Sequence, residues 1–490
     1  MDKKVNSCVM VIFGATGDLT HRKLMPALYN LGMQGRLPEK FDIIAVGRRE
    51  KTTEIYAQEI KEKITAGIVD KADEAAVDDI VSKITYHKQD LNDEKGYNRL
   101  KDTIMSIGPN SNILYYLAVA PQYFSIIVEN LAKTGMAYQE DPWRRIVIEK
   151  PFGRDLASAE KLNKKITKVF PESSIYRIDH YLGKEMLQNI IAIRFANAVF
   201  EPIWNKNFID NIQISSTEKL GVETRGGYYE QSGILRDMVQ NHMLQLLTLT
   251  AMEPPQSFNE KHIRDAKLEV LKSIVRCVDS VETVCGQYGE GEIDGIKAAA
   301  YRDEEKVAPD STTATFAAIR LGIDNERWEG VPFYIRTGKR MPEKTTEVVI
   351  QFKHDPQHAG YKSGGDLKPN LLIIKIHPEE GVEFRFNAKV PRTINDFAQV
   401  KMDFCQNCQT GMSSPEAYER LLHDALRGDA TLFTRWDEVK HSWIFIDKIH
   451  EMWESKSMNF PNYASGTWGP DAAKELLAKD GRIWWVGNDK

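Results

Sequence analysis

The chain has 490 residues, of which 42% are hydrophobic and 9% aromatic, and its formal net charge is -5. These totals provide for two or three packed domains and exclude a global basic field of the kind that draws proteins to nucleic acid or anionic lipid. The longest apolar stretches are well short of the roughly 18 residues that a membrane span needs, and CVMVIFG near the start is too short for a signal peptide. We therefore expect a soluble, cytoplasmic protein without nucleic-acid or membrane partners, whose anionic ligands are held by local sites.

Short β-branched runs alternate with helical patterns from residue 7 to about residue 180. This alternation is typical of βαβ crossovers and of a doubly wound parallel sheet. The sequence therefore predicts an α/β, Rossmann-like domain over residues 1–185, with strands that include CVMVIF (8–13), FDIIAVG (41–47), NILYYLAV (112–119), RRIVIE (144–149) and SIYRI (174–178), and with helices at DLTHRKLMPALYNLG (18–32) and TTEIYAQEIKEKITAGI (52–68).

The stretch FGATGDL (13–19) joins the first of these strands to the first helix. Gly14 and Gly17 allow a tight turn and a close approach to a pyrophosphate, whose charge would be met by the N–H groups and the positive dipole end of the helix. Two glycines also suit a plain turn, but the position after the first strand of a βαβ series favours dinucleotide binding. The expected coenzyme contacts here are Gly14, Ala15, Thr16, Gly17, Asp18 and Leu19.

The end of the second strand indicates which dinucleotide is bound. NAD-binding units place an acidic residue there to hold the ribose 2′-hydroxyl, whereas this chain has Arg48 and Arg49, which suit a 2′-phosphate. The alternative is that the two arginines belong to a solvated loop. We predict NADP as the coenzyme, leave a secondary use of NAD open, and expect further contacts at later strand ends from Asp90, Leu91 and Ala118.

Lys150 follows RRIVIE at the carboxyl edge of the predicted parallel sheet. It precedes Pro151, which restricts Lys150 to extended geometry and allows a cis peptide bond. We expect this cation to point into the crevice, although the fragment also fits a strand-ending turn with an exposed lysine.

RIDHYLGKE (177–185) concentrates charge between the last parallel strand and an apolar run. We expect a helix that begins near His180, which would put His180 and Lys184 side by side at i and i+4 with Tyr181 adjacent. Two donor groups beside a helix N-terminus would form a receptor for a phosphate dianion. Asp179 fits either an N-cap or a residue that orients a catalytic imidazole.

After residue 186, strand-like runs follow one another with turn residues between them, while helices cluster around 233–252, 259–277 and 415–427. This pattern predicts an α+β domain with a large, mainly antiparallel sheet over residues 186–490. Glu218, Lys339 and Lys344 lie at predicted strand ends and suit sugar hydroxyls and a phosphate. The expected strands are NIQISSTE (211–218), TTATFAAIRLGI (312–323), VPFYIRTGK (331–339), TEVVIQFK (346–353), NLLIIKIHP (370–378) and GVEFRFNAK (381–389).

The segment GILRDMVQNHMLQLLTL (233–249) has helical apolar spacing but carries Asp237, Asn241 and His242. A lone histidine in such a helix is usually a satisfied core residue. In a hydride-transfer site, however, oxidation of an alcohol needs a base of near-neutral pKa to take the hydroxyl proton. His242 is therefore the candidate general base.

The five cysteines have irregular spacing and do not make a disulfide framework. Cys405 and Cys408 form a CxxC pair, but a structural zinc would need two further ligands at matching spacing, and none is close by. We predict no metal site.

Several blocks in chain order resemble the glucose-6-phosphate dehydrogenase family. They cover nearly the whole chain and include RIDHYLGKE, which is that family's signature. The other blocks are GATGDLTHRKLMPAL (14–28), EKPFGRDL (149–156), DMVQNH (237–242), RWEGVPFYIRTGKR (327–340) and YASGTWGP (463–470).

The resemblance implies an NADP-dependent dehydrogenase that oxidises C1 of β-D-glucose 6-phosphate to 6-phospho-D-glucono-1,5-lactone, the first step of the oxidative pentose phosphate pathway of glucose and carbohydrate metabolism. His242 matches the family's general base, and Asp179 matches the residue that orients it. Lys150 matches a lysine shared between substrate and coenzyme. The residues that match substrate contacts are His180, Tyr181 and Lys184 in the phosphate pocket and Glu218, Asp237, Lys339 and Lys344 elsewhere.

The resemblance also implies subunits that pair across the second domain as homodimers or homotetramers. Where many members have Ala-Lys after GxxGDL, this chain has Thr20 and His21, while Lys23 keeps the later basic position as an expected coenzyme contact. Some members carry a second, structural NADP, and these residues do not locate such a site.

Two other functions fit parts of the pattern. The first is another NADP-linked sugar or polyol dehydrogenase, which would not explain a phosphate pocket at His180 and Lys184. The second is a non-catalytic NADP(H) sensor that kept the fold, which would not need His242 as a base.

Overall fold

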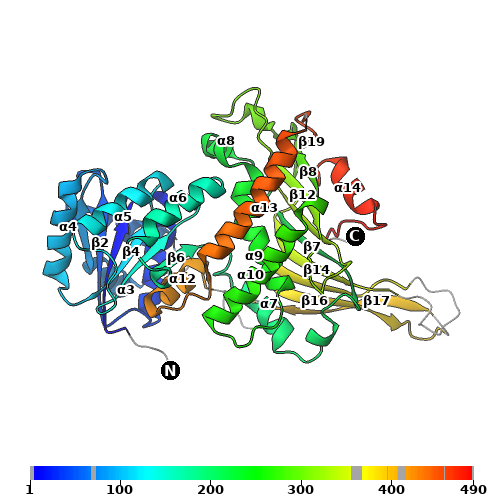
Figure 1. Cartoon of the computed structure of the whole chain (residues 1–490), viewed down its shortest axis with the longest axis horizontal. Helices are drawn as coiled ribbons and strands as arrows, with labels where there is room; N and C mark the ends of the chain where they lie inside the picture. Colours follow the sequence, from blue (N-terminus) through cyan, green and yellow to red (C-terminus); the bar gives the residue numbers. More distant parts are fainter. Residues whose placement is uncertain are drawn as a thin grey trace. The chain divides into compact units, whose positions relative to one another are not determined.

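The structure is a computed structural model that describes residues 5–67, 73–354, 367–393, 396–406, 415–456 and 458–487. The chain divides into two compact units (Figure 1). The first unit is not continuous in sequence, because two segments from the second half of the chain join it. It comprises Met1–Lys184, Ser257–Arg264 and Pro415–Lys440, and the second unit comprises Glu185–Gln256, Asp265–Ser414 and His441–Lys490.

The first unit is built on a seven-stranded sheet in the order β18-β6-β5-β4-β1-β2-β3, in which only β18 is antiparallel to its neighbour. Nearly continuous buried β-branched and aromatic runs suit strands covered on both faces. The sheet reverses its order between β1 and β4, as in dinucleotide-binding folds. The strands are β1 (Ser7–Phe13), β2 (Lys40–Gly47), β3 (Ile84–Lys88), β4 (Asn112–Leu117), β5 (Arg144–Ile148), β6 (Ile175–Ile178) and β18 (Phe433–Thr434).

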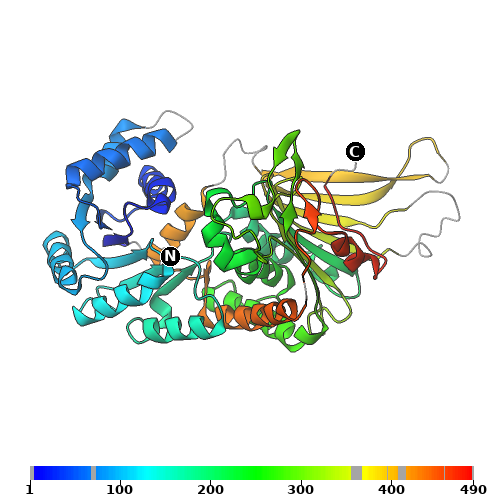
Figure 2. The same cartoon turned by 90° about the horizontal axis from the view of Figure 1, so that it is seen from above.

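Helices of the first unit form two groups (Figure 2). The helices α1, α2, α3 and α12 contact one another, and α4, α5 and α6 form the other group, so each face of the sheet has its own helical layer. Asp73, Asp93 and Asp155 cap the starts of α3, α4 and α6 by accepting backbone N–H groups. The helices are a π-helical turn (Thr20–Leu24), α1 (Met25–Met33), α2 (Thr53–Gly67), α3 (Glu74–Ser82), α4 (Glu94–Ile107), α5 (Phe124–Lys133), α6 (Leu156–Thr167) and α12 (Ala417–Arg427).

The second unit is built on an eight-stranded sheet in the order β17-β16-β15-β14-β7-β13-β12-β8. The pair β7 and β13 is parallel and every other pair is antiparallel. The predicted fold class is thereby confirmed for both halves of the chain. The strands are β7 (Ile209–Thr217), β8 (Glu282–Gly286), β12 (Phe316–Leu321), β13 (Phe333–Gly338), β14 (Thr345–Phe352), β15 (Leu371–His377), β16 (Gly381–Lys389) and β17 (Phe397–Cys405).

Smaller elements complete the chain. Helices α10 and α13 contribute residues to both units, and α7 and α9 pack together in the second unit. The helices are α7 (Glu185–Phe195), α8 (Gly226–Ile234), a π-helix (Leu235–Met243), α9 (Leu244–Ala251), α10 (Glu260–Arg276), α13 (Trp436–Glu454) and α14 (Asp471–Ala478). Two-stranded sheets join β9 (Tyr288–Gly289) to β19 (Tyr463–Ala464) and β10 (Gly291–Ile293) to β11 (Ile296–Ala298). Single 3₁₀ turns are at Pro121–Tyr123, Glu172–Ser174, Glu201–Ile203, Glu223–Arg225, Val278–Ser280 and Tyr301–Asp303.

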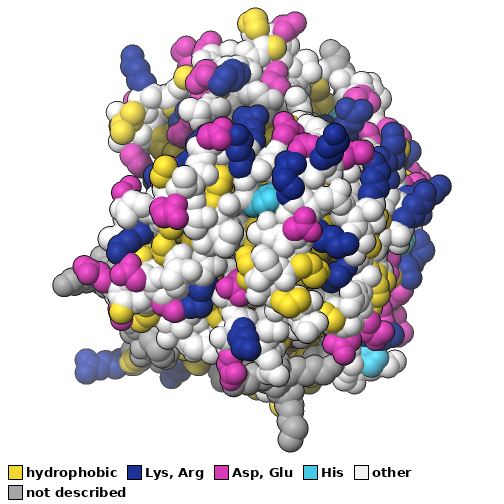
Figure 3. Space-filling view, turned by 90° about the vertical axis from the view of Figure 1, so that its left-hand side faces the viewer, with side chains coloured by type: hydrophobic (Ala, Val, Ile, Leu, Met, Phe, Trp, Pro, Cys, Tyr) yellow, Lys and Arg dark blue, Asp and Glu magenta, His cyan; other side chains and the backbone are white. Residues whose placement is uncertain are grey.

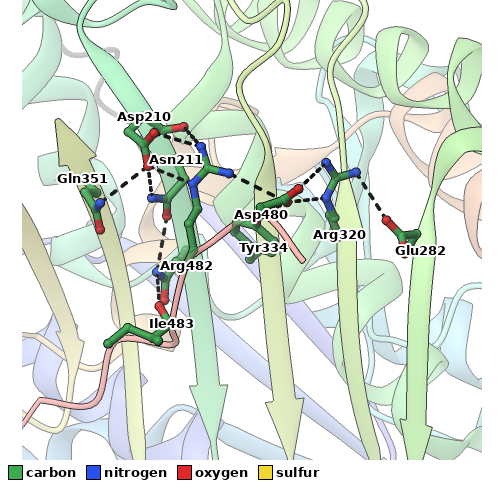
Figure 4. Close-up of polar contacts among 10 residues, drawn as sticks. Asp210, Asn211, Glu282, Arg320, Tyr334, Gln351, Asp480, Arg482 and Ile483 are labelled. Carbon is green, nitrogen blue, oxygen red and sulfur yellow. Dashed lines mark hydrogen bonds and ion pairs between the residues drawn. The ribbon is translucent and has the colours of Figure 1, made fainter. Parts of the chain in front are cut away.

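The segment from Asp480 to Trp485 crosses the large sheet and is fixed by charge-assisted hydrogen bonds (Figure 4). The guanidinium of Arg482 donates to both carboxylate oxygens of Asp210 on β7, at 2.8 Å each. Asp480 accepts from Arg320 on β12 at 2.7 Å and from the hydroxyl of Tyr334 on β13. Bidentate pairs of this kind are stronger than ordinary surface ion pairs, so they hold the segment from Asp480 to Trp485 firmly against the sheet.

No helix among the described residues is long and apolar enough to cross a membrane. On the face shown in Figure 3, lysine and arginine side chains are intermingled with aspartate and glutamate. This face therefore has no uniform basic surface, in line with the net charge of -5.

Candidate active site

The turn after β1 is shaped by a close approach of backbone to backbone. Gly14 has φ 94°, and a Cβ on it would lie 2.1 Å from the carbonyl oxygen of Ala118 at the end of β4. The N–H groups of Gly14 and Ala15 donate to the Val46 carbonyl at the end of β2, at 3.1 and 3.0 Å. The first helical residue after the turn is Asp18. The first N–H groups of a helix have no acceptor within it, so they remain available to an anion.

A pocket of about 390 Å³ lies where β1, β2, β3 and β4 end. It brings together predicted coenzyme residues from four separate segments, Arg48 and Arg49 among them, and it adds Tyr123. Its lining includes Gly14, Thr16, Gly17, Arg48, Arg49, Asp90, Leu91, Ala118 and Tyr123.

The other residues expected to bind the coenzyme do not line this pocket. Ala15 is fully buried, and Asp18 is exposed with Arg22 at 3.5 Å. Leu19 is half-buried, and Lys23 pairs with Glu416, Nζ to Oε1 2.9 Å.

The stretch after β6 that was expected to bind phosphate is a series of turns, so the expectation of a helix that begins near His180 is wrong. Successive i to i+3 bonds run from Leu182 to Asp179, from Gly183 to His180 and from Lys184 to Tyr181, and α7 begins only at Glu185. Asp179 Oδ1 accepts the N–H of Tyr181 at 3.0 Å, as in an Asx-turn. Lys184 Nζ lies 4.3 Å from the centre of the Tyr181 ring, so tight turns rather than helix periodicity bring these side chains together.

Helix α12 supports this stretch from more than two hundred residues away in the sequence. The Tyr418 ring stacks on the His180 imidazole with centroids 6.5 Å apart and planes within 7°. A Cβ on Gly183 would lie 2.5 Å from the Ala417 carbonyl oxygen, so glycine lets the turn approach the helix. The sequence offered no signal for Tyr418, because its helix was assigned to the second half of the chain.

Lys150 is half-buried at the end of β5, and its peptide bond to Pro151 is cis. The preceding Glu149 is buried, and the Tyr116 hydroxyl donates to it at 2.5 Å. Burial raises the pKa of Glu149 to about 6, against the opposing effects of the Tyr116 hydrogen bond and the Lys150 charge. A titratable carboxyl group therefore lies directly behind the lysine.

In the second unit, three predicted substrate residues meet at the carboxyl ends of β7 and β13. Lys339 Nζ forms an ion pair with Glu218 and lies 3.9 Å from Asp237 Oδ2. It is also 5.1 Å from the centre of the Tyr229 ring, and Lys339, Asp237 and Tyr229 are buried. The group offers carboxylate acceptors and a cation, which suit hydrogen bonds to hydroxyl groups. Lys344 is exposed at the same sheet edge and forms no hydrogen bond or ion pair with the described part of the chain.

The segment that carries Asp237 and His242 is a π-helix that continues directly into α9, so the helix expected over 233–252 is present, with its first half π-helical. Gly233 has φ 57° and ψ -179°, a conformation essentially restricted to glycine, and it kinks α8 one residue before α8 ends and this segment begins. The Leu244 N–H bonds the Val239 carbonyl, five residues back. Because i to i+5 bonding widens the turn, Asp237 and His242 lie near one face of the segment. His242 is 1% exposed.

Of the CxxC pair, Cys408 lies outside the described residues. Cys8, Cys277 and Cys285 are free thiols.

Two protein-family models match the chain, and together they cover almost its whole length. Residues 11–189 match the model "Glucose-6-phosphate dehydrogenase, NAD binding domain", and residues 191–485 match "Glucose-6-phosphate dehydrogenase, C-terminal domain". The chain belongs to the glucose-6-phosphate dehydrogenase family.

Relatives named glucose-6-phosphate 1-dehydrogenase match over the whole length. The protein from Bacillus subtilis is 49% identical over 487 residues, covering 97% of this chain and 98% of that one. The protein from Chlamydia pneumoniae is 46% identical, covering 97% and 96%. The similarity is therefore not limited to the coenzyme domain.

Solved structures of glucose-6-phosphate dehydrogenases share the fold. One, described as in complex with its substrate glucose-6-phosphate, has a TM-score of 0.89 and 36% identity and covers 99% of this chain and 100% of its own. Another, from Mycobacterium avium, has a TM-score of 0.84 and 34% identity and covers 99% of each chain.

Glu149 should make the stability of this family member depend on pH. Its pKa of about 6 is raised above the ordinary value of 4.5, so its stabilising contribution is complete below pH 4.5 and is lost as the pH rises through 6. The loss amounts to roughly 2 kcal/mol. Glu149→Gln should remove this pH dependence. Denaturant unfolding between pH 4.5 and 8 should therefore show a difference in free energy of unfolding between variant and wild type that changes with pH. A difference that stays constant over this range would contradict the assignment.

Proposed function

We propose that this chain oxidises C1 of β-D-glucose 6-phosphate to 6-phospho-D-glucono-1,5-lactone and transfers the hydride to NADP+. Full-length similarity to proteins named glucose-6-phosphate 1-dehydrogenase supports the activity. The observation that carries the proposal within this structure is the group formed by Glu218, Asp237 and Lys339, of which Asp237 and Lys339 are buried. It joins acceptors for sugar hydroxyls to the π-helix that carries the candidate base.

The pocket at the strand ends fits NADP. Gly14 and Gly17 leave room for the pyrophosphate, and the helix that follows presents N–H donors to it. Arg48 and Arg49 are exposed, and neither guanidinium group forms a hydrogen bond or ion pair with the residues that the structure describes, so both suit the 2′-phosphate. When bound, NADP+ supplies the nicotinamide ring that accepts the hydride. Lys23 adds a basic group near the turn.

His242 is the general base in this proposal. It takes the proton of the C1 hydroxyl as the hydride leaves, and Asp179 orients its imidazole. The Asp179 carboxylate is held in place by the N–H of Tyr181, which suits a positioning role.

The substrate phosphate is bound by His180, Tyr181 and Lys184, whose side chains cluster in consecutive turns. Lys150 contacts both substrate and coenzyme from the end of β5. The sugar hydroxyls are bound by Glu218, Asp237 and Lys339, with Lys344 at the same sheet edge.

We propose that the functional boundary lies near residue 185. Residues 1–185 bind NADP, and residues 186–490 bind the sugar and form the subunit interface. Limited proteolysis at this boundary should leave NADP binding intact in the nicked chain, in which Pro415–Lys440 is still present to complete the first unit. A nicked chain that stays folded but no longer binds NADP would contradict the division.

We further propose that the protein acts in the cytoplasm. Three of the four described cysteines, Cys8, Cys277 and Cys285, are free thiols, which suits a compartment that keeps most thiols reduced, and the fourth, Cys405, is disulfide-bonded. Fractionation of cells that contain the protein would show activity elsewhere if this were wrong.

His242→Gln should lower kcat by roughly 10² to 10⁴, because a general base is lost, while NADP+ binding is retained. The readouts are NADPH absorbance with glucose 6-phosphate and a fluorescence titration of coenzyme binding. A variant that keeps more than a tenth of the wild-type kcat would exclude His242 as the base. A wild-type protein that binds NADP+ without forming NADPH would favour the sensor function.

Lys184→Ala should chiefly raise KM for glucose 6-phosphate, by roughly 10- to 100-fold, because it removes a charge contact present in ground and transition states alike. Oxidation of free glucose, which lacks the phosphate, should stay slow and unchanged. The matched control is Lys161→Ala, at an exposed lysine of α6. Equal rates with glucose 6-phosphate and glucose in the wild type would favour another sugar dehydrogenase.

We propose that the protein forms homodimers or homotetramers through the β17 edge of the large sheet. Val400, Met402 and Phe404 alternate along this outermost strand and are 38%, 63% and 43% exposed, which is costly for an uncovered edge. Met402→Lys should therefore shift the sedimentation velocity towards that of a monomer, and Ile296→Lys on β11 should leave it unchanged. A wild-type protein that sediments as a monomer at micromolar concentration would overturn this proposal.

A further inference from the structure

The loop between β2 and α2 holds its charged side chains in two different ways. Glu50 forms an ion pair with Lys88, and Lys51 forms one with Glu59. Arg48 and Arg49, directly before them, have no such partner among the described residues. Ion pairs therefore fix the second half of the loop, while Arg48 and Arg49 in its first half line the pocket.

Tyr86 on β3 contacts this loop at three points. Its hydroxyl donates to the Arg49 carbonyl oxygen at 2.7 Å. Its hydroxyl oxygen would lie 2.6 Å from a Cβ on Gly47, so glycine makes room for it. Its backbone N–H donates to the Thr53 hydroxyl at the start of α2, at 3.1 Å. One residue thus fixes the chain before, within and after the arginine pair.

Tyr56 makes the corresponding contact with the glycine turn. Its hydroxyl donates to the Ala15 carbonyl at 2.8 Å, and its ring lies 5.0 Å from that of Tyr86. Burial raises the pKa of both phenols, which keeps both hydroxyls protonated as donors. Two adjacent tyrosines therefore support two separate parts of the coenzyme pocket.

We propose that Tyr86 is a positioning residue for coenzyme choice, which holds Arg48 and Arg49 against the 2′-phosphate and so sets the preference for NADP over NAD. The Tyr86 hydroxyl donates a hydrogen bond to the main chain of Arg49. In this proposal the arginine pair contacts only a coenzyme that carries a 2′-phosphate. Tyr56 supports the turn for the pyrophosphate, which both coenzymes share. This inference rests on the proposed function, because it concerns the coenzyme of the same reaction.

The kinetic test compares Tyr86→Phe with Tyr56→Phe, since each removes one hydroxyl and keeps its ring. Tyr86→Phe should raise KM for NADP+ by about three- to tenfold and KM for NAD+ by less than about twofold, with kcat unchanged. Tyr56→Phe should raise both KM values by a similar factor. An equal rise for both coenzymes in Tyr86→Phe, or none, would overturn the proposal.

A binding test separates this inference from the proposed function. In calorimetry on the full chain, Tyr86→Phe should weaken 2′,5′-ADP by about three- to tenfold and leave 5′-ADP unchanged, whether or not the protein turns over glucose 6-phosphate. Unchanged affinity for 2′,5′-ADP would refute the role of Tyr86 even in an active enzyme. If the wild-type protein forms no NADPH but Tyr86→Phe still weakens only the binding of 2′,5′-ADP, the proposed activity is refuted and the role of Tyr86 is not.

A second substitution keeps the test valid if Tyr86→Phe unfolds the protein. Gly47→Ala should displace the Tyr86 hydroxyl and produce the same selective loss for NADP+, because its Cβ needs the space of that oxygen. Where both variants fold, Gly47→Ala should add little in the Tyr86→Phe background, since both act through one hydrogen bond. Full additivity of the two effects would contradict that shared route.

Discussion

The close approach of β1 and β4 at Gly14 and Ala118 is the constraint on which the coenzyme pocket depends. A Cβ at position 14 would overlap the Ala118 carbonyl oxygen, and φ 94° is a conformation that L side chains rarely adopt. These two strands stand where the sheet reverses its order, so the connections that follow them leave in opposite directions and open the crevice. A larger residue at position 14 would push β1 and β4 apart. The sheet and the pocket therefore both require glycine at this position.

The two units contribute different charges to the proposed reaction. Arg48, Arg49, Lys150, His180 and Lys184 all belong to the first unit, which therefore supplies the groups suited to phosphates. The second unit supplies Lys339 already paired with two carboxylates, so its cation is largely compensated. A buried cation in this state attracts a dianion weakly, whereas the carboxylates remain good acceptors for hydroxyl groups. This difference in charge supports the proposal that the first unit binds the phosphate and the second binds the sugar hydroxyls.

The sequence predicted which residues line the candidate coenzyme pocket more completely than it predicted the region after β6. Gly14, Arg48, Asp90 and Ala118 could be placed together because parallel strands bring their carboxyl ends to one edge of a sheet. Tyr418 and the edge strand β18 could not be placed there, because their contacts with β6 and the turn after it join residues more than two hundred positions apart. The turns from Asp179 to Lys184 cannot be told from the first turn of a helix in the sequence, because charged residues before an apolar run are typical of both. The structure shows i to i+3 bonds there.

The π-helix from Leu235 to Met243 explains why a periodicity argument finds His242 but not its neighbours. In an α-helix, residues five apart are separated by about 140° and would face different surroundings. The i to i+5 bonding seen between Leu244 and Val239 brings Asp237 and His242 towards one side, at the cost of a less favourable helical geometry. Such geometry persists only where the surrounding structure enforces it, and here Gly233 on one side and the buried helix α9 on the other do so. The spacing of five in DMVQNH, which is irregular for an α-helical pattern, is therefore the feature that turns Asp237, a proposed substrate contact, towards the side of His242, the proposed base.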